Sequence, residues 1–99
     1  MQNAYTVEQI KNRLRPVFYR NQVKKAVLFG SYSKGTATPQ SDVDIWVDSG
    51  MHGLSFFGLL EDVFQTMECP VDLIDKIDVV PGSRVDQEIS RTGVVIYEQ

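Results

Sequence analysis

Two aspartates in the middle of the chain have the spacing that metal-assisted phosphate chemistry needs. Asp42 and Asp44 lie two positions apart in an alternating segment, so on an extended strand both carboxylates project from the same face. Two adjacent carboxylates repel each other unless a cation lies between them. Hard oxygen ligands suit Mg²⁺, which completes its coordination with water and substrate phosphates. The pair therefore predicts a magnesium site.

A glycine and a serine lie shortly before this pair. Gly30 ends the apolar run 25–29, and Ser31 follows it, with ten residues between Ser31 and Asp42. Glycine allows a sharp turn that exposes amide donors, and the serine adds a hydroxyl beside them. Such a turn can hold a terminal phosphate. A phosphate-binding turn that faces a magnesium pair indicates nucleoside triphosphate chemistry.

A third carboxylate, Asp72, lies inside the apolar segment 71–75. A charge is costly in such a segment unless it is paired or binds a metal. If this strand neighbours the first acidic one, all three acids converge. Asp75 is close enough in sequence to replace Asp72, although a surface position is expected for it, as for Asp48 and Asp78.

The first element that must support these residues is a helix that begins after Thr6. Thr6 and Gln9 form a capping-box pattern, and apolar residues then recur with helical period. Pro16 lacks an amide donor, which predicts that the helix kinks or ends near Arg15.

The remaining elements follow from apolar runs and from the glycines and prolines between them. We expect strands over 25–29, 42–48, 71–75 and 94–97, a loop over 31–41 with at most one helical turn, and helices over 54–67 and after Ser83. The stripe Leu54, Phe57, Leu60, Phe64 and Met67 is expected to face the core, as are Val85 and Ile89. Strands that alternate with helices predict an α/β domain with one sheet covered by helices.

Length and composition restrict the class of protein further. The 99 residues fit one domain, 1–99, and the formal net charge of −3 disfavours nucleic acid or an anionic membrane as partner. Cys69, the single cysteine, excludes an internal disulfide, and no leader or membrane segment is expected, so the cytoplasm is the default location. No role is expected for Cys69 or His52, and Trp46 is expected to pack rather than to stack on a base.

Residues 28–35 and 41–45 together resemble the signature of the minimal nucleotidyltransferases, which belong to the DNA polymerase β-like superfamily. The strand around Asp72 is similar to the third-acid strand of that family, and the resemblance covers roughly residues 5–98. The chain departs from the usual pattern at Ser33, where the family has alanine, and at Trp46, where an aliphatic residue is more usual. The resemblance implies a single nucleotidyltransferase domain with a mixed four-stranded sheet and helices packed against it.

The resemblance also implies a reaction and roles for the site residues. AMP is transferred from ATP to an acceptor, and pyrophosphate is released. Asp42 and Asp44 would hold one Mg²⁺, and Asp72 would join them around a second ion or act instead as the general base. Gly30 and Ser31 would bind the β- and γ-phosphates, and Lys34 would add positive charge there.

The acceptor implied by the resemblance is a protein, because free-standing members of the family resemble antitoxins that modify a tyrosine of a helical HEPN toxin. Such a pair would form a hetero-oligomer. Two alternatives stay open: a binding antitoxin or regulatory subunit without catalysis, and the catalytic subunit of a small-molecule nucleotidyltransferase of the aminoglycoside type.

Overall fold

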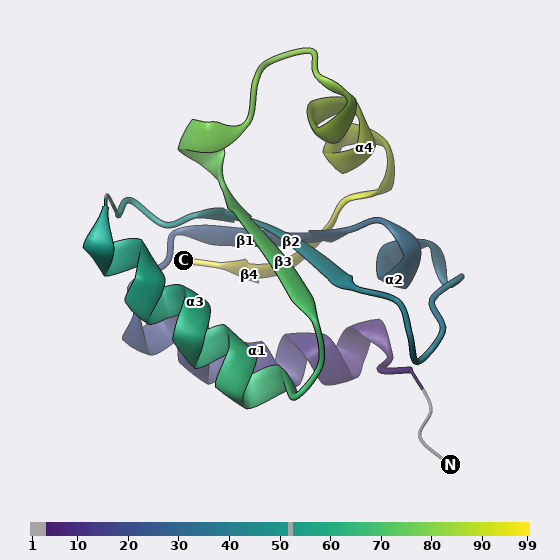
Figure 1. The fold of residues 1–99 in the computed structure, drawn as a ribbon, viewed down its shortest axis with the longest axis horizontal. Coiled ribbons are helices and arrows are strands. Elements are labelled where there is room, and N and C mark those ends of the chain that lie inside the picture. Colours follow the sequence, from purple (N-terminus) through teal and green to yellow (C-terminus); the bar gives the residue numbers. More distant parts are fainter. Residues whose placement is uncertain (1–3, 52) are drawn as a thin grey trace.

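The computed structural model describes residues 4–51 and 53–99, so the expectation for His52 lies outside the described residues. One sheet and the helices around it make up the fold (Figure 1). The elements are, in order, α1 (Val7–Arg20), β1 (Lys25–Phe29), α2 (Ser31–Lys34), β2 (Val43–Asp48), α3 (Leu54–Met67), β3 (Val71–Asp75), the 3₁₀ turn η1 (Lys76–Asp78), α4 (Arg84–Thr92) and β4 (Val94–Glu98).

The sheet is mixed and has the strand order β3-β2-β1-β4. β1 runs antiparallel to β2 and to β4, whereas β2 and β3 are parallel. A parallel pair needs a crossover connection, and α3 provides it. The α/β class and the mixed four-stranded sheet expected from the sequence are therefore confirmed.

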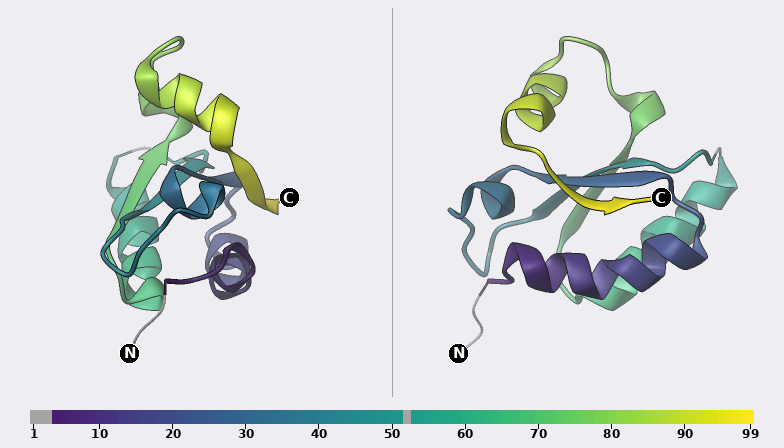
Figure 2. Two further views of the ribbon diagram at one scale, coloured as in Figure 1. Left: turned by 90° about the vertical axis from the view of Figure 1, so that its right-hand side faces the viewer. Right: turned by 180° about the vertical axis from the view of Figure 1, so that it is seen from behind.

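Helices α1 and α3 lie together against one face of the sheet, and α4 lies on the opposite side (Figures 1 and 2). The core fills the space between the sheet and the first pair of helices. Every second residue of β2 faces this core, so Val43, Ile45 and Val47 are buried and the intervening side chains point to the other face. The sheet thus separates this packed layer from an opposite face on which Asp44 of β2 is paired with Asp72 of β3.

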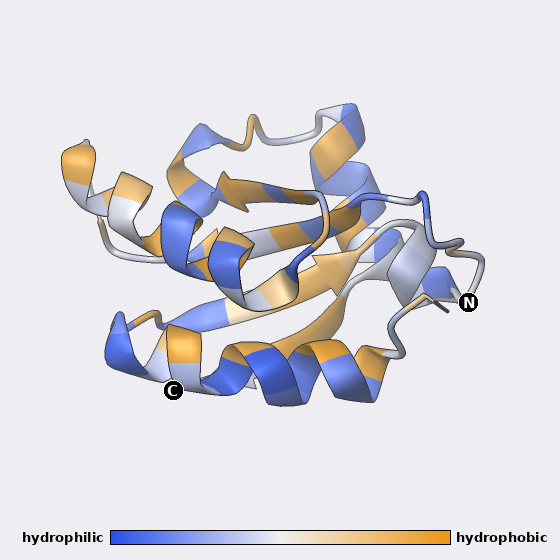
Figure 3. Ribbon diagram, turned by 60° about the horizontal axis from the view of Figure 1, so that its bottom comes forward, coloured by the Kyte–Doolittle hydropathy of each residue, from blue (hydrophilic) through white to orange (hydrophobic). Residues whose placement is uncertain are grey.

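Helix α1 begins as expected but extends further. Thr6 and Gln9 form the reciprocal capping box. The sequence predicted that the helix ends or kinks near Arg15. It does not end there, because α1 continues through Pro16 to Arg20. Pro16 removes one helical hydrogen bond, but Val17 and Phe18 after it are buried in the core, and burial of two large apolar side chains outweighs that loss. Figure 3 shows the apolar positions of α1 turned toward the sheet.

The apolar faces of α3 and α4 differ from the expected ones. The buried residues of α3 are Leu59, Val63 and Met67, whereas Leu54, Phe57 and Phe64 are largely exposed. Apolar residues cover more than half of the circumference of α3, so helical period alone could not select the packed side. In α4, no residue is fully buried and Val85 is exposed, so the expected core-facing side of this short helix is not present.

Candidate functional site

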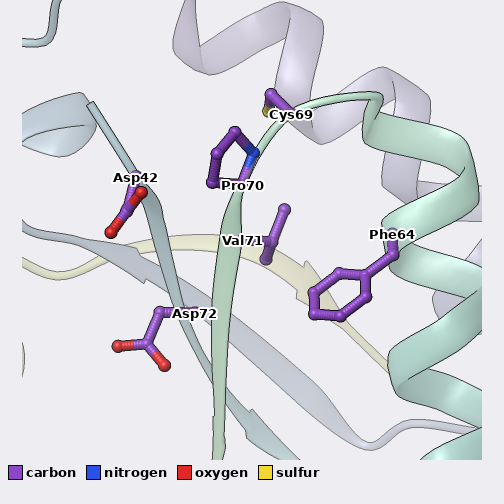
Figure 4. Close-up of a pocket in the computed structure, with 6 residues that line it drawn as sticks. All are labelled: Asp42, Phe64, Cys69, Pro70, Val71 and Asp72. Atoms are coloured by element: carbon purple, nitrogen blue, oxygen red, sulfur yellow. The ribbon is translucent and has the colours of Figure 1, made fainter. Parts of the chain in front are cut away.

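Two of the three predicted acids are direct neighbours in the sheet. Asp44 on β2 is the register partner of Asp72 on β3. Because the strands are parallel and adjacent, paired residues project from the same face at a spacing of about 4.8 Å. That face is the one opposite α1 and α3. Asp42 immediately precedes β2, and its carboxylate points to the same side of the strands as that of Asp72, away from Phe64 (Figure 4).

Asp44 is the most strongly perturbed of these acids. Its side chain is half-buried, whereas Asp42 and Asp72 are exposed. Burial raises the pKa of Asp44 to about 6, and the nearby negative charges of Asp72, Asp42 and Glu88 add to the rise. Four carboxylates therefore share one local field, which a cation would relieve.

The acids fit a magnesium ion that is completed by substrate, rather than a closed metal cage. Within residues 4–51 and 53–99, no three His, Cys, Asp or Glu side chains converge as a preformed ligand set. Mg²⁺ in nucleotide sites is held by one or two carboxylates together with phosphate oxygens and water. The neighbouring Asp44 and Asp72, with Asp42 beside them, supply that hard-oxygen donor set.

Gly30 forms a sharp turn that lies close against Asp44. Its backbone has φ +77° and ψ −150°, a region that only glycine adopts without strain. A Cβ at this position would lie 2.5 Å from Oδ2 of Asp44. Both the conformation and the close approach therefore require glycine, and they bring the end of β1 against the half-buried acid.

The donors of this turn differ in part from the expectation. The Gly30 amide is occupied, because it donates to Oγ1 of Thr92 at 3.1 Å. The amides that remain for a ligand are those of the first turn of α2, since the first helical turn has no carbonyl acceptors of its own. The segment expected as a loop with at most one helical turn begins with such a turn, α2, which starts at Ser31. Ser33, at the position that departs from the family pattern, donates its hydroxyl to the Gly30 carbonyl at 2.8 Å.

Lys34 is the last residue of α2, and its side chain extends toward α4. Its Nζ lies 3.5 Å from Oε1 of Glu88, and the lysine side chain is about half exposed. An exposed ion pair of this kind contributes at most about 1 kcal/mol. Lys34 is therefore available to an anion that enters the site.

Two residues of α4 belong to this site and were missed from the sequence. The negative charge of Glu88 contributes to the raised pKa of Asp44, and Glu88 also pairs with Lys34, while the Thr92 hydroxyl accepts a hydrogen bond from the Gly30 amide. They lie four positions apart, so both occupy one face of the helix. That spacing was the available signal, but nothing in the sequence shows that α4 returns to the end of β1.

Asp75 has a structural role instead of the expected ones. It is buried on the core side of β3 and accepts hydrogen bonds from the Ser49 amide at 3.1 Å, the Ser49 hydroxyl at 2.6 Å and the Ile77 amide at 3.3 Å. The expectation of a surface charge is therefore wrong. Asp75 cannot replace Asp72 either, because residues three positions apart on a strand face opposite sides.

A hollow of about 470 Å³ opens beside the acids at the edge formed by β3. It is lined by Asp42, Phe64, Cys69, Pro70, Val71 and Asp72 (Figure 4). The hollow therefore combines two of the carboxylates with an apolar wall, and it lies across β2 from the Gly30 turn, which follows β1. A second reactant could reach the acids from this side while a phosphate occupies the turn.

The mixed sheet, the paired acids and the glycine turn define the nucleotidyltransferase class of α/β domain. Residues 8–99 match the family model described as "Polymerase beta, Nucleotidyltransferase", and the chain belongs to this family.

Relatives and solved structures agree with this assignment. Two proteins of Methanocaldococcus jannaschii are 32% and 34% identical to the chain: "Putative protein adenylyltransferase MJ0435" over 63% of this chain and 66% of the relative, and "Putative protein adenylyltransferase MJ1379" over 72% and 79%. The alignment thus spans slightly less than two thirds of the first of these relatives.

The solved structures share the fold. A structure described as a "putative minimal nucleotidyltransferase" superposes with a TM-score of 0.73 at 21% identity and covers 94% of this chain and 98% of that one. A toxin-antitoxin complex with AMP-PNP gives a TM-score of 0.75 at 24% identity, over 90% of this chain and 73% of that chain. A structure of a tri-AMPylated HEPN toxin of Shewanella oneidensis in complex with an MNT antitoxin superposes with a TM-score of 0.70 at 19% identity. This match covers 95% of this chain and 74% of that chain. Across the described part of this chain, we find no helix long and apolar enough to cross a membrane.

Proposed function

We propose that this chain transfers AMP from ATP to a hydroxyl of a partner protein in a magnesium-dependent reaction. The observation that carries the proposal is the register of Asp44 with Asp72 directly beside the Gly30 turn. It gives one place where carboxylates for a metal and amide donors for a phosphate meet.

The residues divide between the two ends of the triphosphate. Asp42 and Asp44 would hold one Mg²⁺, and Asp72 would join them around a second ion. When bound, the metal ions supply Lewis-acid stabilisation of the entering and leaving oxygens. Gly30 shapes the turn, while Ser31 and the free amides after it bind the β- and γ-phosphates.

The group transfer itself is an in-line displacement. The acceptor oxygen forms a bond to the α-phosphorus, the bond from that phosphorus to the bridging oxygen of the β-phosphate breaks, and pyrophosphate leaves. The hydroxyl proton passes to Asp72 in its alternative role as general base, or to water. Lys34 gives up its ion pair with Glu88 and binds the negatively charged pyrophosphate as it leaves.

The partner that we propose is a helical HEPN-type toxin, with this chain as its antitoxin in a hetero-oligomer in the cytoplasm. The structural likeness to two toxin-antitoxin complexes supports this partner, one of them with AMP-PNP and the other with an AMPylated toxin. The net charge of −3 favours neither nucleic acid nor a membrane as a further partner. The hollow beside Asp42 and Asp72 is the side from which the acceptor hydroxyl would enter.

The test is to incubate the chain with Mg²⁺, α-labelled ATP and the helical product of the adjacent reading frame. We expect label on that product, none without Mg²⁺, and none with the double variant D42N/D44N. A variant such as D78N, which removes an exposed carboxylate outside the site, should act as the wild type.

Two further assays separate the alternatives: neutralisation of the toxin by D42N/D44N, and the same labelling reaction with an aminoglycoside added. If D42N/D44N neutralises the toxin with wild-type potency, binding without catalysis accounts for the antitoxin activity. If label passes to an aminoglycoside and to no protein, the chain is a subunit of a small-molecule enzyme. Either result would overturn protein adenylylation.

A further inference from the structure

The last turn of α4 is fastened to the Gly30 turn by one side chain. Oγ1 of Thr92 accepts the Gly30 amide at 3.1 Å and donates to the Glu88 carbonyl at 2.9 Å, although Thr92 and Gly30 are 62 residues apart in sequence. A threonine hydroxyl has one donor hydrogen and two acceptor lone pairs. Both hydrogen bonds can therefore exist together, and the bond within the helix holds the hydroxyl in the orientation that receives Gly30.

The turn needs such a contact because glycine does not hold one conformation by itself. At φ +77° and ψ −150°, Gly30 lies where its backbone has many alternatives of similar energy. A rotation of the peptide before it would move its amide and, with it, the start of α2. The contact with Thr92 selects one of these conformations.

The end of α4 is itself held firmly against the sheet. Gly93 follows Thr92 directly, and a Cβ at Gly93 would lie 2.7 Å from a methyl carbon of Val27 on β1. The backbone of α4 thus approaches β1 as closely as glycine permits. Gly30, which is bound by Thr92, in turn lies against Asp44. A continuous series of contacts therefore leads from β1 through Thr92 and Gly30 to the half-buried acid.

We propose that Thr92 is a positioning residue for nucleotide binding: its hydroxyl fixes the Gly30 turn so that the amides at the start of α2 face the triphosphate. This inference rests on the proposed function, because the triphosphate is the ligand that the turn would bind. Thr92 itself does not touch the nucleotide, since its hydroxyl is already used by Gly30 and by Glu88.

The experiment compares Thr92→Val, which keeps the shape and removes the hydroxyl, with Thr92→Ser, which keeps the hydroxyl. Ser90→Ala, at an exposed position of the same helix, is the matched control. Thr92→Ala is added because it leaves more space than valine, in case valine disturbs the fold. The measurements are the dissociation constant for Mg·ATP, KM and kcat for AMP transfer, and hydrogen exchange of the Gly30 amide.

We expect Thr92→Val and Thr92→Ala to weaken Mg·ATP binding about tenfold, which is the effect of losing about one hydrogen bond of average strength. The change should appear in KM for ATP more than in kcat, and the Gly30 amide should exchange faster. Thr92→Ser should return the dissociation constant to within about twofold of the wild type, and Ser90→Ala should not alter it.

Three results would overturn the inference. Wild-type affinity in both Thr92→Val and Thr92→Ala would show that the hydroxyl does not position the turn. Equal loss in Thr92→Ser and Thr92→Val would assign the effect to packing. A wild-type chain that does not bind Mg·ATP at all would overturn the proposed function and this inference together, which separates that failure from the other two.

Discussion

Replacement of Asp44 by asparagine should stabilise the protein in the absence of metal, although it should abolish AMP transfer. Asp44 is half-buried beside Asp72, Asp42 and Glu88, and its pKa in the folded protein is raised to about 6 from an ordinary value of 3.8. Asparagine keeps nearly the same shape against Gly30 and removes the charge. The gain in stability is therefore the relief of burial and of like-charge repulsion.

The size and the sign of this effect follow from the pKa. A rise of roughly two pH units corresponds to about 3 kcal/mol as an upper limit. Because the Asp44 side chain is only half-buried, screening by solvent reduces this to about 1 kcal/mol. The folded-state pKa is raised, so the wild type loses stability as the pH rises from about 4, the unfolded value, through about 6. Asp44→Asn should lack this loss.

The assay is thermal unfolding in EDTA at pH 4 and at pH 7.5. At pH 7.5, Asp44→Asn should unfold about 4–8 °C above the wild type, which is the shift that about 1 kcal/mol produces in a domain of this size. At pH 4 the two curves should nearly coincide. Excess Mg²⁺ with ATP should stabilise the wild type and not the variant. Asp78→Asn, at an exposed position outside the site, is the control for a general charge effect. An Asp44→Asn protein that is less stable than the wild type at pH 7.5, or equally shifted at both pH values, would refute the electrostatic explanation.

Three further predictions concern the turn, the buried carboxylate and the hollow. Gly30→Ala should lose Mg·ATP binding and destabilise the fold by about 1–2 kcal/mol more than Gly82→Ala. Gly82 is the control because its φ is similar, +78°, but no atom lies within 4 Å of a Cβ added there. Equal effects of the two substitutions in urea titrations would contradict the contact with Asp44. Ser49→Ala should destabilise the protein by about 1.5–3 kcal/mol and leave Mg·ATP binding intact, because the Asp75 carboxylate loses a hydrogen bond in the core. Ser55→Ala, at an exposed position, is the control. The same unfolding midpoint in both variants would disprove the role of Asp75. Alkylation of Cys69, which lines the hollow, should block AMP transfer to the partner without weakening Mg·ATP binding. The alkylation should be slow because burial raises the pKa of the thiol. Cys69→Ala is the control that cannot be alkylated, and full transfer by the alkylated wild type would exclude the hollow as the acceptor side.

Local sequence patterns predicted the elements well where a single short-range interaction decides the outcome. The capping box of Thr6 and Gln9, the turn at Gly30 and the alternation of β2 are all present in the structure. In these cases the hydrogen bond, the allowed φ or the period of the strand acts within a few residues. The same reasoning failed at Pro16, because the local cost of proline is smaller than the burial of Val17 and Phe18 in the distant core.

The predicted site residues illustrate the same division. Asp42 and Asp44 share a face for reasons that the chain order alone determines, since they lie on one strand. Their neighbour Asp72 was expected on the condition that its strand lies next to β2, and the parallel register meets that condition. Asp75, three residues further on, was misplaced because its partner Ser49 comes from another part of the chain.

The sequence by itself therefore determined the family, the acid pair and the glycine turn, because each depends on residue types at short, fixed spacings. Only the tertiary structure decided which side of α3 is buried, where Asp75 points, and that Glu88 and Thr92 of α4 complete the site. Those features arise from contacts such as Ser49 to Asp75 and Gly30 to Thr92, which are 26 and 62 residues apart, and their geometry depends on how every element packs.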